Sequence, residues 1–316
     1  MDGKFNKKNR DAVMNTNKKY VLFILLIISL GGYLLYNKYT GDFRLSNITY
    51  STPFNPEWAT TPLASDDKKD LLSKLQQHYK FIGKGDQIYA FVSEDGNYVI
   101  KFFQFKHLKP SSLDPFFSYL PQMKKYLDDG AKRKQHKIDR LFNSHWIAYK
   151  FNRENSGLVY VHLNKTDNEL KTTLQVSDRL GIKHSIDLDN TVFVLQKKGT
   201  PSREYISPFL SKGNTDEAKY LFRQLIDLYL SEYEKGIYDL DHNLMYNTGF
   251  IDGRPARLDV GKMILDERIK DPRFYKKDLE NVAWKRIDKW MEKYFPQQRI
   301  AIANDLHQKL EEIFPE

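Results

Sequence analysis

The longest uncharged apolar run of the chain lies close to its N-terminus. It is the seventeen-residue segment Tyr20 to Tyr36, YVLFILLIISLGGYLLY. About 17 residues is the shortest helix that spans a bilayer, and tyrosines near both ends suit the two interfaces. The run has no amphipathic face and therefore predicts a membrane-spanning helix, with a buried core helix or a cleaved signal peptide as alternatives. No small-x-small cleavage site follows, which favours an uncleaved anchor.

Polar segments flank this run. Residues 1–19 contain six Lys or Arg and two Asp, which predict a disordered basic tail. Few cations follow the run, so the positive-inside rule places the N-terminus in the cytoplasm and residues 38–316 on the opposite side. The membrane itself is not identified by the sequence. Residues 37–65 contain three prolines and several Ser and Thr, which predict an extended linker.

Residues 66–198 are predicted to be rich in strands. Residues 66–79 place leucines on one helical face, and residues 113–153 have a helical pattern that is clearest from 132 to 151. The alternation over residues 81–105, divided by Asp95-Gly96, predicts an antiparallel meander. Further strands are predicted at residues 158–163, 172–176, 183–188 and 192–196.

Residues 199–316 are predicted to be mainly helical. Residues 214–235 carry an apolar stripe of helical period, and Asn214 is expected to cap this helix with Glu217 as its reciprocal partner. Asp252-Gly253 stands between two short apolar runs and predicts a hairpin over residues 248–258. Two more helices are predicted at residues 278–295 and 300–314. The fold class expected from these elements is α+β.

Composition narrows the functional classes. The chain has 316 residues and a net charge of +9, a balance that permits anionic partners without specifying one. No nucleic-acid-binding motif is present. The absence of cysteine excludes disulfides, zinc–thiolate sites and a cysteine nucleophile.

Polar residues with metal-binding chemistry gather around the predicted hairpin. Asp241 is followed six residues later by Asn247, and Asp259 comes directly after the second strand of the hairpin. The hairpin brings the Asp241–Asn247 loop and Asp259 to the same end of a small sheet. Two carboxylates and an amide oxygen at one place suit a hard divalent cation such as Mg²⁺.

A second group of residues has phosphate-binding chemistry. Gly83 and Gly85 stand at the first turn of the meander, where glycines let the backbone approach a phosphate without a Cβ clash. Lys101 follows Val99-Ile100 in the third strand and supplies a positive charge for phosphate oxygens. Alone, each of these features is more often an ordinary turn or a solvated lysine.

The order of these features resembles the protein-kinase-like superfamily. The resemblance implies a two-lobed fold behind the membrane helix, with a strand-rich lobe at residues 66–198 and a helical lobe at 199–316. It implies ATP and Mg²⁺ as cofactors, with Gly83, Gly85 and Lys101 on the nucleotide and Asn247 and Asp259 on the metal. Asp241 would orient the acceptor hydroxyl, and Asp239 is a rival for that role.

The sequence departs from this pattern at four places. A third glycine would fall at Ile88, the Asp–Asn gap is six residues instead of five, and Asp239-Leu240 replaces the usual His-Arg before Asp241. No Glu lies between Lys101 and Glu154 to pair with the lysine, which leaves Asp139 or Glu154 as substitutes. The sequence therefore predicts a membrane-anchored phosphotransferase, with a membrane-anchored pseudokinase or a membrane-tethered structural protein as alternatives.

Overall fold

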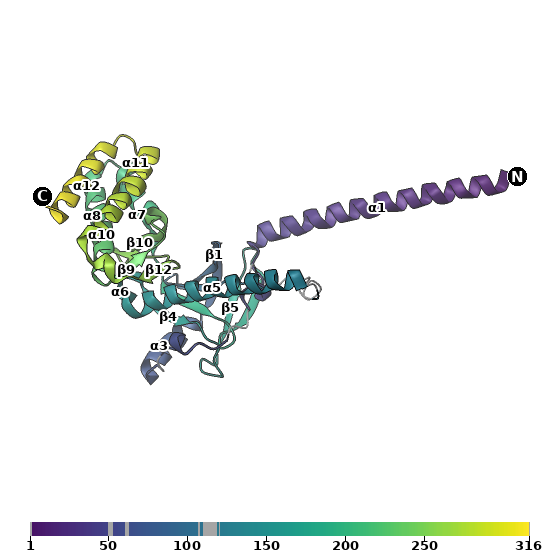
Figure 1. Cartoon of the computed structure of the whole chain (residues 1–316), viewed down its shortest axis with the longest axis horizontal. Helices are drawn as coiled ribbons and strands as arrows, with labels where there is room; N and C mark the ends of the chain where they lie inside the picture. The colour runs from purple at the N-terminus through teal and green to yellow at the C-terminus, as the bar shows by residue number, and fades with distance from the viewer. Residues whose placement is uncertain are drawn as a thin grey trace.

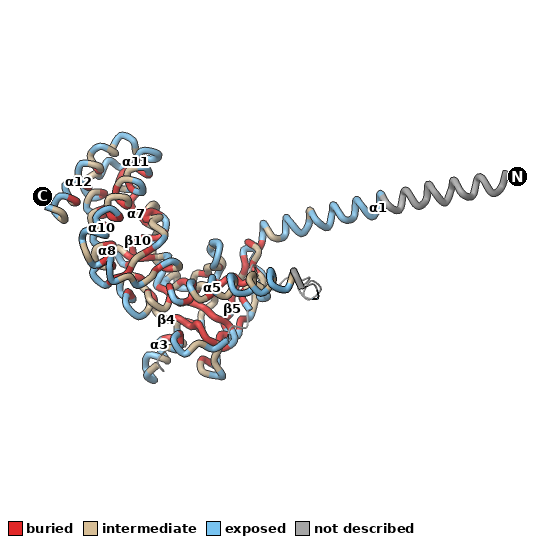
Figure 2. The backbone as a smooth tube through the Cα atoms, viewed as in Figure 1, coloured by how far each residue is buried: buried red, intermediate tan, exposed pale blue. Residues whose placement is uncertain are grey.

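A long helix stands apart from the folded part of the molecule. The computed structural model describes residues 2–49, 53–60, 63–106, 108–109, 119 and 121–315. Helix α1 (Asp2–Thr40) extends away from the rest of the chain (Figure 1). Its segment Tyr20–Thr40 is apolar enough to cross a membrane, and none of its most apolar window is buried (Figure 2). This exposure excludes a core helix, whereas a membrane span and a signal sequence both fit.

The basic tail is helical, and the prediction of a disordered segment over residues 1–19 was wrong from Asp2 onward. The helix α1 begins at Asp2 instead of at the apolar run. No proline occurs before Pro53. A helix that is already nucleated in the apolar run adds one hydrogen bond for each further residue, so its extension toward the N-terminus needs no new nucleus.

The predicted linker is also wrong, because much of it packs against the sheet. Phe43 and Ile48 are buried with the sheet residues, and Trp58 is buried against Phe142 at a ring distance of 5.1 Å. Two short helices occur here, α2 (Leu45–Ile48) and η1 (Pro56–Trp58). The prolines do not keep this segment extended, since its three large apolar side chains bury more favourably than they remain in water.

A seven-stranded mixed sheet forms the centre of the N-terminal half. Its strand order is β4-β7-β3-β2-β1-β5-β6, and β1 pairs with β5 in parallel while the other pairs are antiparallel. The predicted meander and the four later strands are confirmed. The strands are β1 (His78–Lys84), β2 (Ile88–Ser93), β3 (Tyr98–Phe103), β4 (Leu158–His162), β5 (Thr173–Ser177), β6 (Lys183–Asp187) and β7 (Phe193–Lys197).

Helices cover both faces of this sheet. Helix α3 (Ser65–Leu75) buries Leu71 and Leu75 with Phe102 on one face. Helix α5 (Pro121–Phe151) buries Leu141 and Phe142 with Phe103 on the other. The adjacent residues Phe102 and Phe103 of β3 thus point to opposite faces of the sheet, because side chains alternate along a strand. The predicted helix over residues 66–79 ends early because Tyr79 pairs within the sheet, and most of residues 113–120 lies outside the described part.

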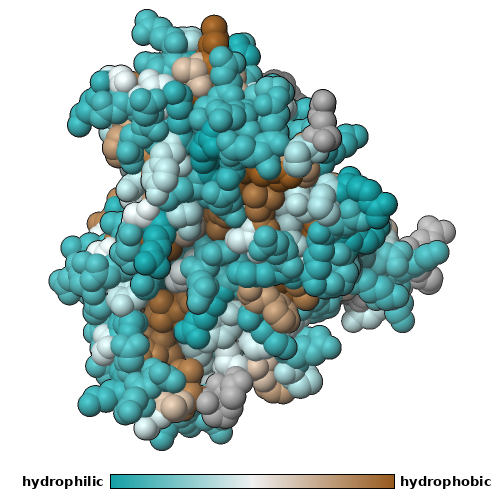
Figure 3. Space-filling model, turned by 90° about the vertical axis from the view of Figure 1, so that its left-hand side faces the viewer, coloured by the Kyte–Doolittle hydropathy of each residue, from teal (hydrophilic) through white to brown (hydrophobic). Residues whose placement is uncertain are grey.

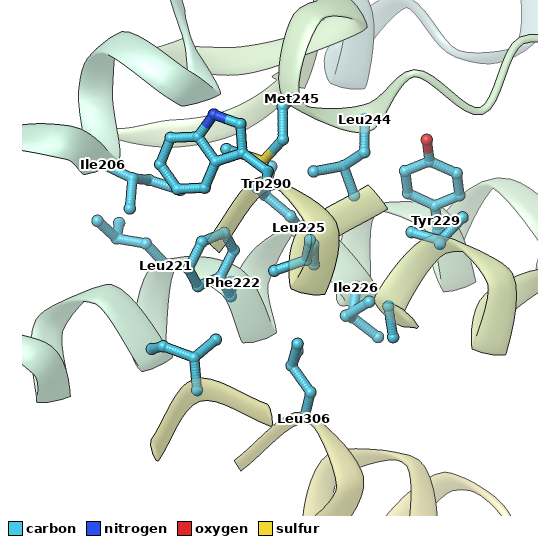
Figure 4. Packing of buried hydrophobic residues seen from close by; sticks show 14 of the residues in the cluster. Ile206, Leu221, Phe222, Leu225, Ile226, Tyr229, Leu244, Met245, Trp290 and Leu306 are labelled. Atoms are coloured by element: carbon cyan, nitrogen blue, oxygen red, sulfur yellow. The ribbon is translucent and has the colours of Figure 1, made fainter. Parts of the chain in front are cut away.

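The C-terminal half has its own helical core (Figure 4). In the view of Figure 4, Leu221, Leu225 and Phe222 of α8 point toward Trp290 and Met245. The prediction that the Asn214 side chain caps α8 was wrong. A backbone turn leads into the helix instead, closed by the hydrogen bond from Asn214 N to the carbonyl oxygen of Phe209 at 2.9 Å. The helices are α7 (Ser202–Ser211), α8 (Thr215–Glu234), α9 (Leu244–Asn247), η2 (Glu267–Lys270), α10 (Pro272–Asn281), the π-helical segment η3 (Val282–Asp288), α11 (Lys289–Tyr294) and α12 (Arg299–Ile313).

Two small sheets join these halves. The predicted hairpin is confirmed as β10 (Thr248–Ile251) and β11 (Arg254–Arg257), and β8 (Thr200–Pro201) pairs with β10. Asp252 and Gly253 have φ values of 52° and 75°, the conformation that a two-residue hairpin turn requires. The second sheet pairs β9 (Ile237–Asp239) with β12 (Met263–Leu265). On the face of the molecule turned away from α1, apolar side chains gather in recesses between hydrophilic ones (Figure 3).

Candidate functional site

Lys101 extends from the central sheet to the C-terminal half. Its Nζ donates a hydrogen bond to the carbonyl oxygen of Leu258 at 2.5 Å, across 157 residues of sequence. Burial lowers the pKa of the Lys101 ammonium, and the nearby Asp259 carboxylate opposes that change. This lysine is therefore a partly buried cation at the junction of the two halves and not a solvated strand residue.

Asn247 and Asp259 are brought together by backbone hydrogen bonds. The carbonyl oxygen of Asn247 accepts from the N–H groups of Leu258 and Asp259 at 2.8 and 3.0 Å. The Asn247 side chain donates from Nδ2 to the carbonyl oxygen of Asp241 at 3.1 Å. The Asp259 carboxylate accepts from Gly261 N at 2.9 Å and is largely exposed. The loop from Asp241 to Asn247 and the residues after β11 thus meet at one point, as the hairpin predicts.

Asp241 and Asp239 occupy different environments. The Asp241 carboxylate is partly exposed and pairs with Lys262 Nζ at 2.9 Å. Burial acts to raise the pKa of Asp241, but Lys262 outweighs it, and the pKa lies below its usual range. The Asp239 carboxylate is buried, pairs with Arg257 at 2.9 Å, and accepts from Asp241 N at 2.9 Å. Asp239 therefore fixes the backbone of Asp241, and the accessible carboxylate is that of Asp241.

Arg257 is a member of this site that the sequence analysis missed. Its guanidinium is fully buried, forms an ion pair with Glu232, and lies 4.3 Å from the centre of the Tyr229 ring. The ion pair with Glu232 connects β11 to α8, and the pair with Asp239 connects β11 to β9. Burial raises the pKa of Asp239 to about 6, although Arg257 opposes that rise. The only sequence signal was a charged residue between the apolar Ala256 and Leu258 of the predicted strand.

The β1–β2 turn reaches the same site through Gln87, whereas Gly83 lines a pocket beside the end of α1. A Cβ atom at Gly83 or Gly85 would meet nothing within 4 Å, and neither residue has a positive φ. Gln104 holds the turn by donating from Nε2 to the carbonyl oxygen of Gly85 at 2.7 Å. At the tip of the turn, Gln87 reaches the Asp259–Gly261 segment, since its Oε1 would lie 3.5 Å from a Cβ atom on Gly261. The fold does not itself require glycine at Gly83 or Gly85.

Neither acidic residue expected to pair with Lys101 does so. Asp139 accepts a hydrogen bond from Gln135 within α5 at 2.8 Å, and Glu154 lies beyond α5 in α6 (Arg153–Ser156). His145 of α5 interacts electrostatically with Lys101 and Asp259, and its Nδ1 is 2.8 Å from the carbonyl oxygen of Leu141. Burial lowers the pKa of His145 to about 4, so its ring is neutral near pH 7.

The oxygen atoms of Asn247 and Asp259 suit a magnesium ion whose remaining ligands are water and phosphate. Within the described residues, no group of three or more His, Asp or Glu could hold a metal ion alone. The Asp259 carboxylate and the Asn247 amide oxygen would supply two oxygen ligands, from residues whose backbones are hydrogen-bonded to each other. Mg²⁺ typically binds one or two protein oxygens and completes its shell with water and phosphate. The residues present therefore fit the ion that the sequence predicts.

The segment between the two halves packs closely against its surroundings at Gln196 and Gly199. Gln196 donates to the carbonyl oxygens of Ser156 and Arg257 at 2.6 and 3.1 Å. A Cβ atom on Gly199 would lie 2.5 Å from Leu258 and 2.9 Å from Ile251. The connection thus packs tightly against the same Leu258 whose carbonyl oxygen binds Lys101.

Comparison of the chain with models of protein families finds no match, and comparison with curated proteins finds none either.

Proposed function

We propose that this protein is a membrane-anchored, kinase-like phosphotransferase that uses ATP and Mg²⁺. The observation that carries the proposal is the meeting of Lys101, Asp259 and Asn247 at one point of the structure. Lys101 contacts Leu258, and Leu258 and Asp259 both bind the backbone of Asn247. A cation for phosphates and two oxygen ligands for a metal are the parts that phosphoryl transfer needs.

The arrangement of elements supports the same proposal. The strand order β4-β7-β3-β2-β1, with α5 inserted between β3 and β4, resembles the small lobe of a kinase-like fold. A connection over residues 196–200 then leads to the helices, as the resemblance implies for the larger lobe. The β5–β6 pair is an addition at the β1 edge.

Each residue has a role in this proposal that its environment permits. Lys101 would exchange the carbonyl oxygen of Leu258 for nucleotide phosphates, because a phosphate is the stronger acceptor for an ammonium. Asn247 and Asp259 would hold Mg²⁺, which neutralises charge on the phosphates. Asp241, the accessible carboxylate, would orient the acceptor hydroxyl, while Asp239 and Arg257 hold its loop in place.

The environment of Lys101 favours a second candidate function. A neutral His145 of α5 interacts with Lys101, the expected Asp139 bonds to Gln135 instead, and Asp241 is engaged by Lys262. Both features suit a pseudokinase, a binding module that holds nucleotide without transferring phosphate. A membrane-tethered structural protein without a nucleotide site is the third alternative.

Nucleotide binding by the full-length protein, with and without Mg²⁺, tests the proposal. Asp259→Asn keeps the shape and the acceptor for Gly261 N but removes the charge, so we expect it to abolish the Mg²⁺-dependent part of ATP affinity. The melting temperature without ligand should fall only slightly. Asp259 is exposed and forms no ion pair within the described residues, but its charge favours the protonated form of the buried Lys101. Asp252→Asn, at the exposed tip of the β10–β11 hairpin, is the matched control and should bind like the wild type.

The outcomes separate the candidate functions. Wild-type protein that shows no Mg²⁺-dependent ATP binding would refute the metal site at Asn247 and Asp259. Mg²⁺-dependent binding without phosphate transfer to any acceptor or to water would identify a pseudokinase. Transfer or hydrolysis that is lost in Asp241→Asn but retained in the Asp252→Asn control would identify a phosphotransferase.

A further inference from the structure

The apolar helix α1 is joined to the sheet by a fixed turn. Gly41 and Asp42 both have positive φ values, 65° and 62°, and reverse the chain directly after Thr40. The carbonyl oxygen of Asp42 accepts from Tyr89 Oη at 2.7 Å and from Asn47 Nδ2 at 2.9 Å. Its carboxylate pairs with Lys106. Strand β2, through Tyr89, therefore holds the point at which α1 leaves the domain.

Arg44 strengthens this junction from the other side. Its guanidinium donates to Asn37 Oδ1 at 2.6 Å and lies over the rings of Tyr33 and Tyr36, at 5.3 and 5.6 Å from their centres. The last turns of α1 are thus bound to the residues that follow the reversal. The face of the domain around this junction has a defined position relative to the membrane that α1 would enter.

A basic pocket opens at the junction. Its volume is about 500 Å³, and it is lined by Lys38 at the end of α1, by Lys84 of β1 and by Arg179 of the β5–β6 turn, together with Phe81 and Ile82. None of its lining residues is acidic. Lys84 is 3.9 Å from the Asp42 carboxylate, whose nearer partner is Lys106, and Arg179 forms no ion pair within the described part of the chain.

Exposed apolar side chains occur in the elements that line this pocket. Ile82 on β1 is 53% exposed, and Leu180 and Ile182 on the β5–β6 turn are 52% and 45% exposed. Leu180 follows Arg179 directly in the sequence. Large apolar side chains beside cations are the composition of a surface that lies in a membrane interface, where cations meet headgroups and apolar side chains reach the acyl boundary.

We propose that this junction surface, formed by Lys38, Ile82, Lys84, Arg179, Leu180 and Ile182, binds anionic lipid headgroups of the membrane that α1 enters. The position argues for lipid, because Lys38 lies in the last turn of the candidate membrane span. The charge argues for an anionic headgroup. The surface would hold the domain against the bilayer. It adjoins the β1–β2 turn, because Gly83 also lines the pocket.

Fluorescence of the full chain in lipid nanodiscs tests this inference. The chain has no cysteine, so Leu180→Cys creates a single site for an environment-sensitive dye. Nanodiscs of phosphatidylcholine are compared with nanodiscs that contain about 30% phosphatidylglycerol, which supplies the anionic headgroup. A lipid with a nitroxide near its headgroup is the quencher. We expect several-fold stronger quenching at position 180 in the anionic nanodiscs than in the neutral ones.

Matched variants make the outcome decisive. Tyr220→Cys places the dye on α8, at an exposed position of the helical half, and should show little quenching in either nanodisc. Adding Arg179→Glu to Leu180→Cys should remove the effect of phosphatidylglycerol, whereas Lys212→Glu, a charge reversal at the exposed end of α7, should not. Equal quenching at positions 180 and 220 would overturn the lipid-binding surface. Quenching at 180 that depends neither on phosphatidylglycerol nor on Arg179 would overturn its preference for anionic headgroups.

Discussion

His145 shows how a single buried side chain can change the chemistry of a site. It lies on the face of α5 that packs on the sheet, and its ring is 5.0 Å from that of Phe103 in an edge-to-face contact. Lys101 and Asp259 are close enough to influence its charge, yet burial dominates and lowers its pKa to about 4. The neutral ring neither attracts nor repels Lys101 strongly, and the lysine donates a hydrogen bond to the carbonyl oxygen of Leu258.

The buried histidine makes stability depend on pH. Its pKa in the folded protein, about 4, lies below the value of 6.5 in an exposed histidine, so the unfolded chain binds the proton more readily. The neutral His145 contributes up to roughly 3 kcal/mol to the free energy of unfolding. This contribution is fully present above about pH 6.5 and is lost as the pH falls toward about 4. We expect urea unfolding of His145→Gln to show a weaker loss of stability over this range than the wild type.

A control variant isolates this effect. His307→Gln changes an exposed histidine on α12 and should leave the pH dependence of unfolding parallel to that of the wild type. Asp239 acts in the opposite direction, because its raised pKa of about 6 makes stability fall as the pH rises from about 4 to 6, but it is present in all three proteins and cancels in the comparison. Identical pH profiles for His145→Gln and the wild type would contradict the burial of a neutral ring.

At the scale of elements, two kinds of glycine occur near the site. Gly249 on β10 allows a close approach, since a Cβ atom there would lie 2.3 Å from the carbonyl oxygen of Thr200. Gly85 in the β1–β2 turn has open space around it and no positive φ. The first glycine is required for the packing of β10 against β8, whereas the second has no such requirement within the described structure.

Substitution of the two glycines should separate folding from binding. Gly249→Ala forces backbone and side chains apart and should destabilise the protein by about 1–3 kcal/mol. Gly85→Ala should leave the melting temperature unchanged and weaken ATP binding several-fold, because the new methyl group would occupy space beside the nucleotide phosphates. Thermal unfolding and ATP titration of both variants check this. Undiminished ATP affinity in Gly85→Ala would show that the turn does not contact nucleotide.

Local signals predicted the elements well where turn chemistry and periodicity agreed. Asp252-Gly253 and Asp95-Gly96 fixed two hairpins, and the stripe of α8 fixed a long helix. Errors arose where a distant contact decided the conformation. Phe43 and Trp58 are buried by residues far along the chain, so the segment that contains them could not be recognised as packed from its proline content.

For the molecule as a whole, the sequence indicated which polar residues would gather but not their partners. The hairpin placed Asn247 near Asp259 by local geometry. The contact of Lys101 with Leu258 and the pairing of Arg257 with Glu232 depend on how the sheet half and the helical half meet. No periodicity encodes that packing, and for this reason His145 and Arg257 were found only in the structure.

The orientation of the chain across a membrane remains a prediction at the scale of the whole molecule. Residues 1–19 hold six cations, whereas Lys38 and Arg44 are the nearest that follow the apolar run. Lys84 and Arg179 also lie at the junction with α1, but they come more than 40 residues later in the chain. The positive-inside rule counts charges within about 15–20 residues of a span, so these two do not enter the comparison.

We therefore expect the N-terminus in the cytoplasm and the folded domain on the opposite side. In intact cells or sealed vesicles, a C-terminal tag should resist protease added on the cytoplasmic side and become sensitive only after the membrane is permeabilised. A tag at the N-terminus should give the reverse result and serves as the control. Mobility of the full-length chain also distinguishes a retained α1 from a cleaved signal sequence, which would shorten it. A C-terminal tag digested without permeabilisation would contradict the predicted orientation, and it would place the proposed nucleotide site on the side of the membrane where ATP is abundant.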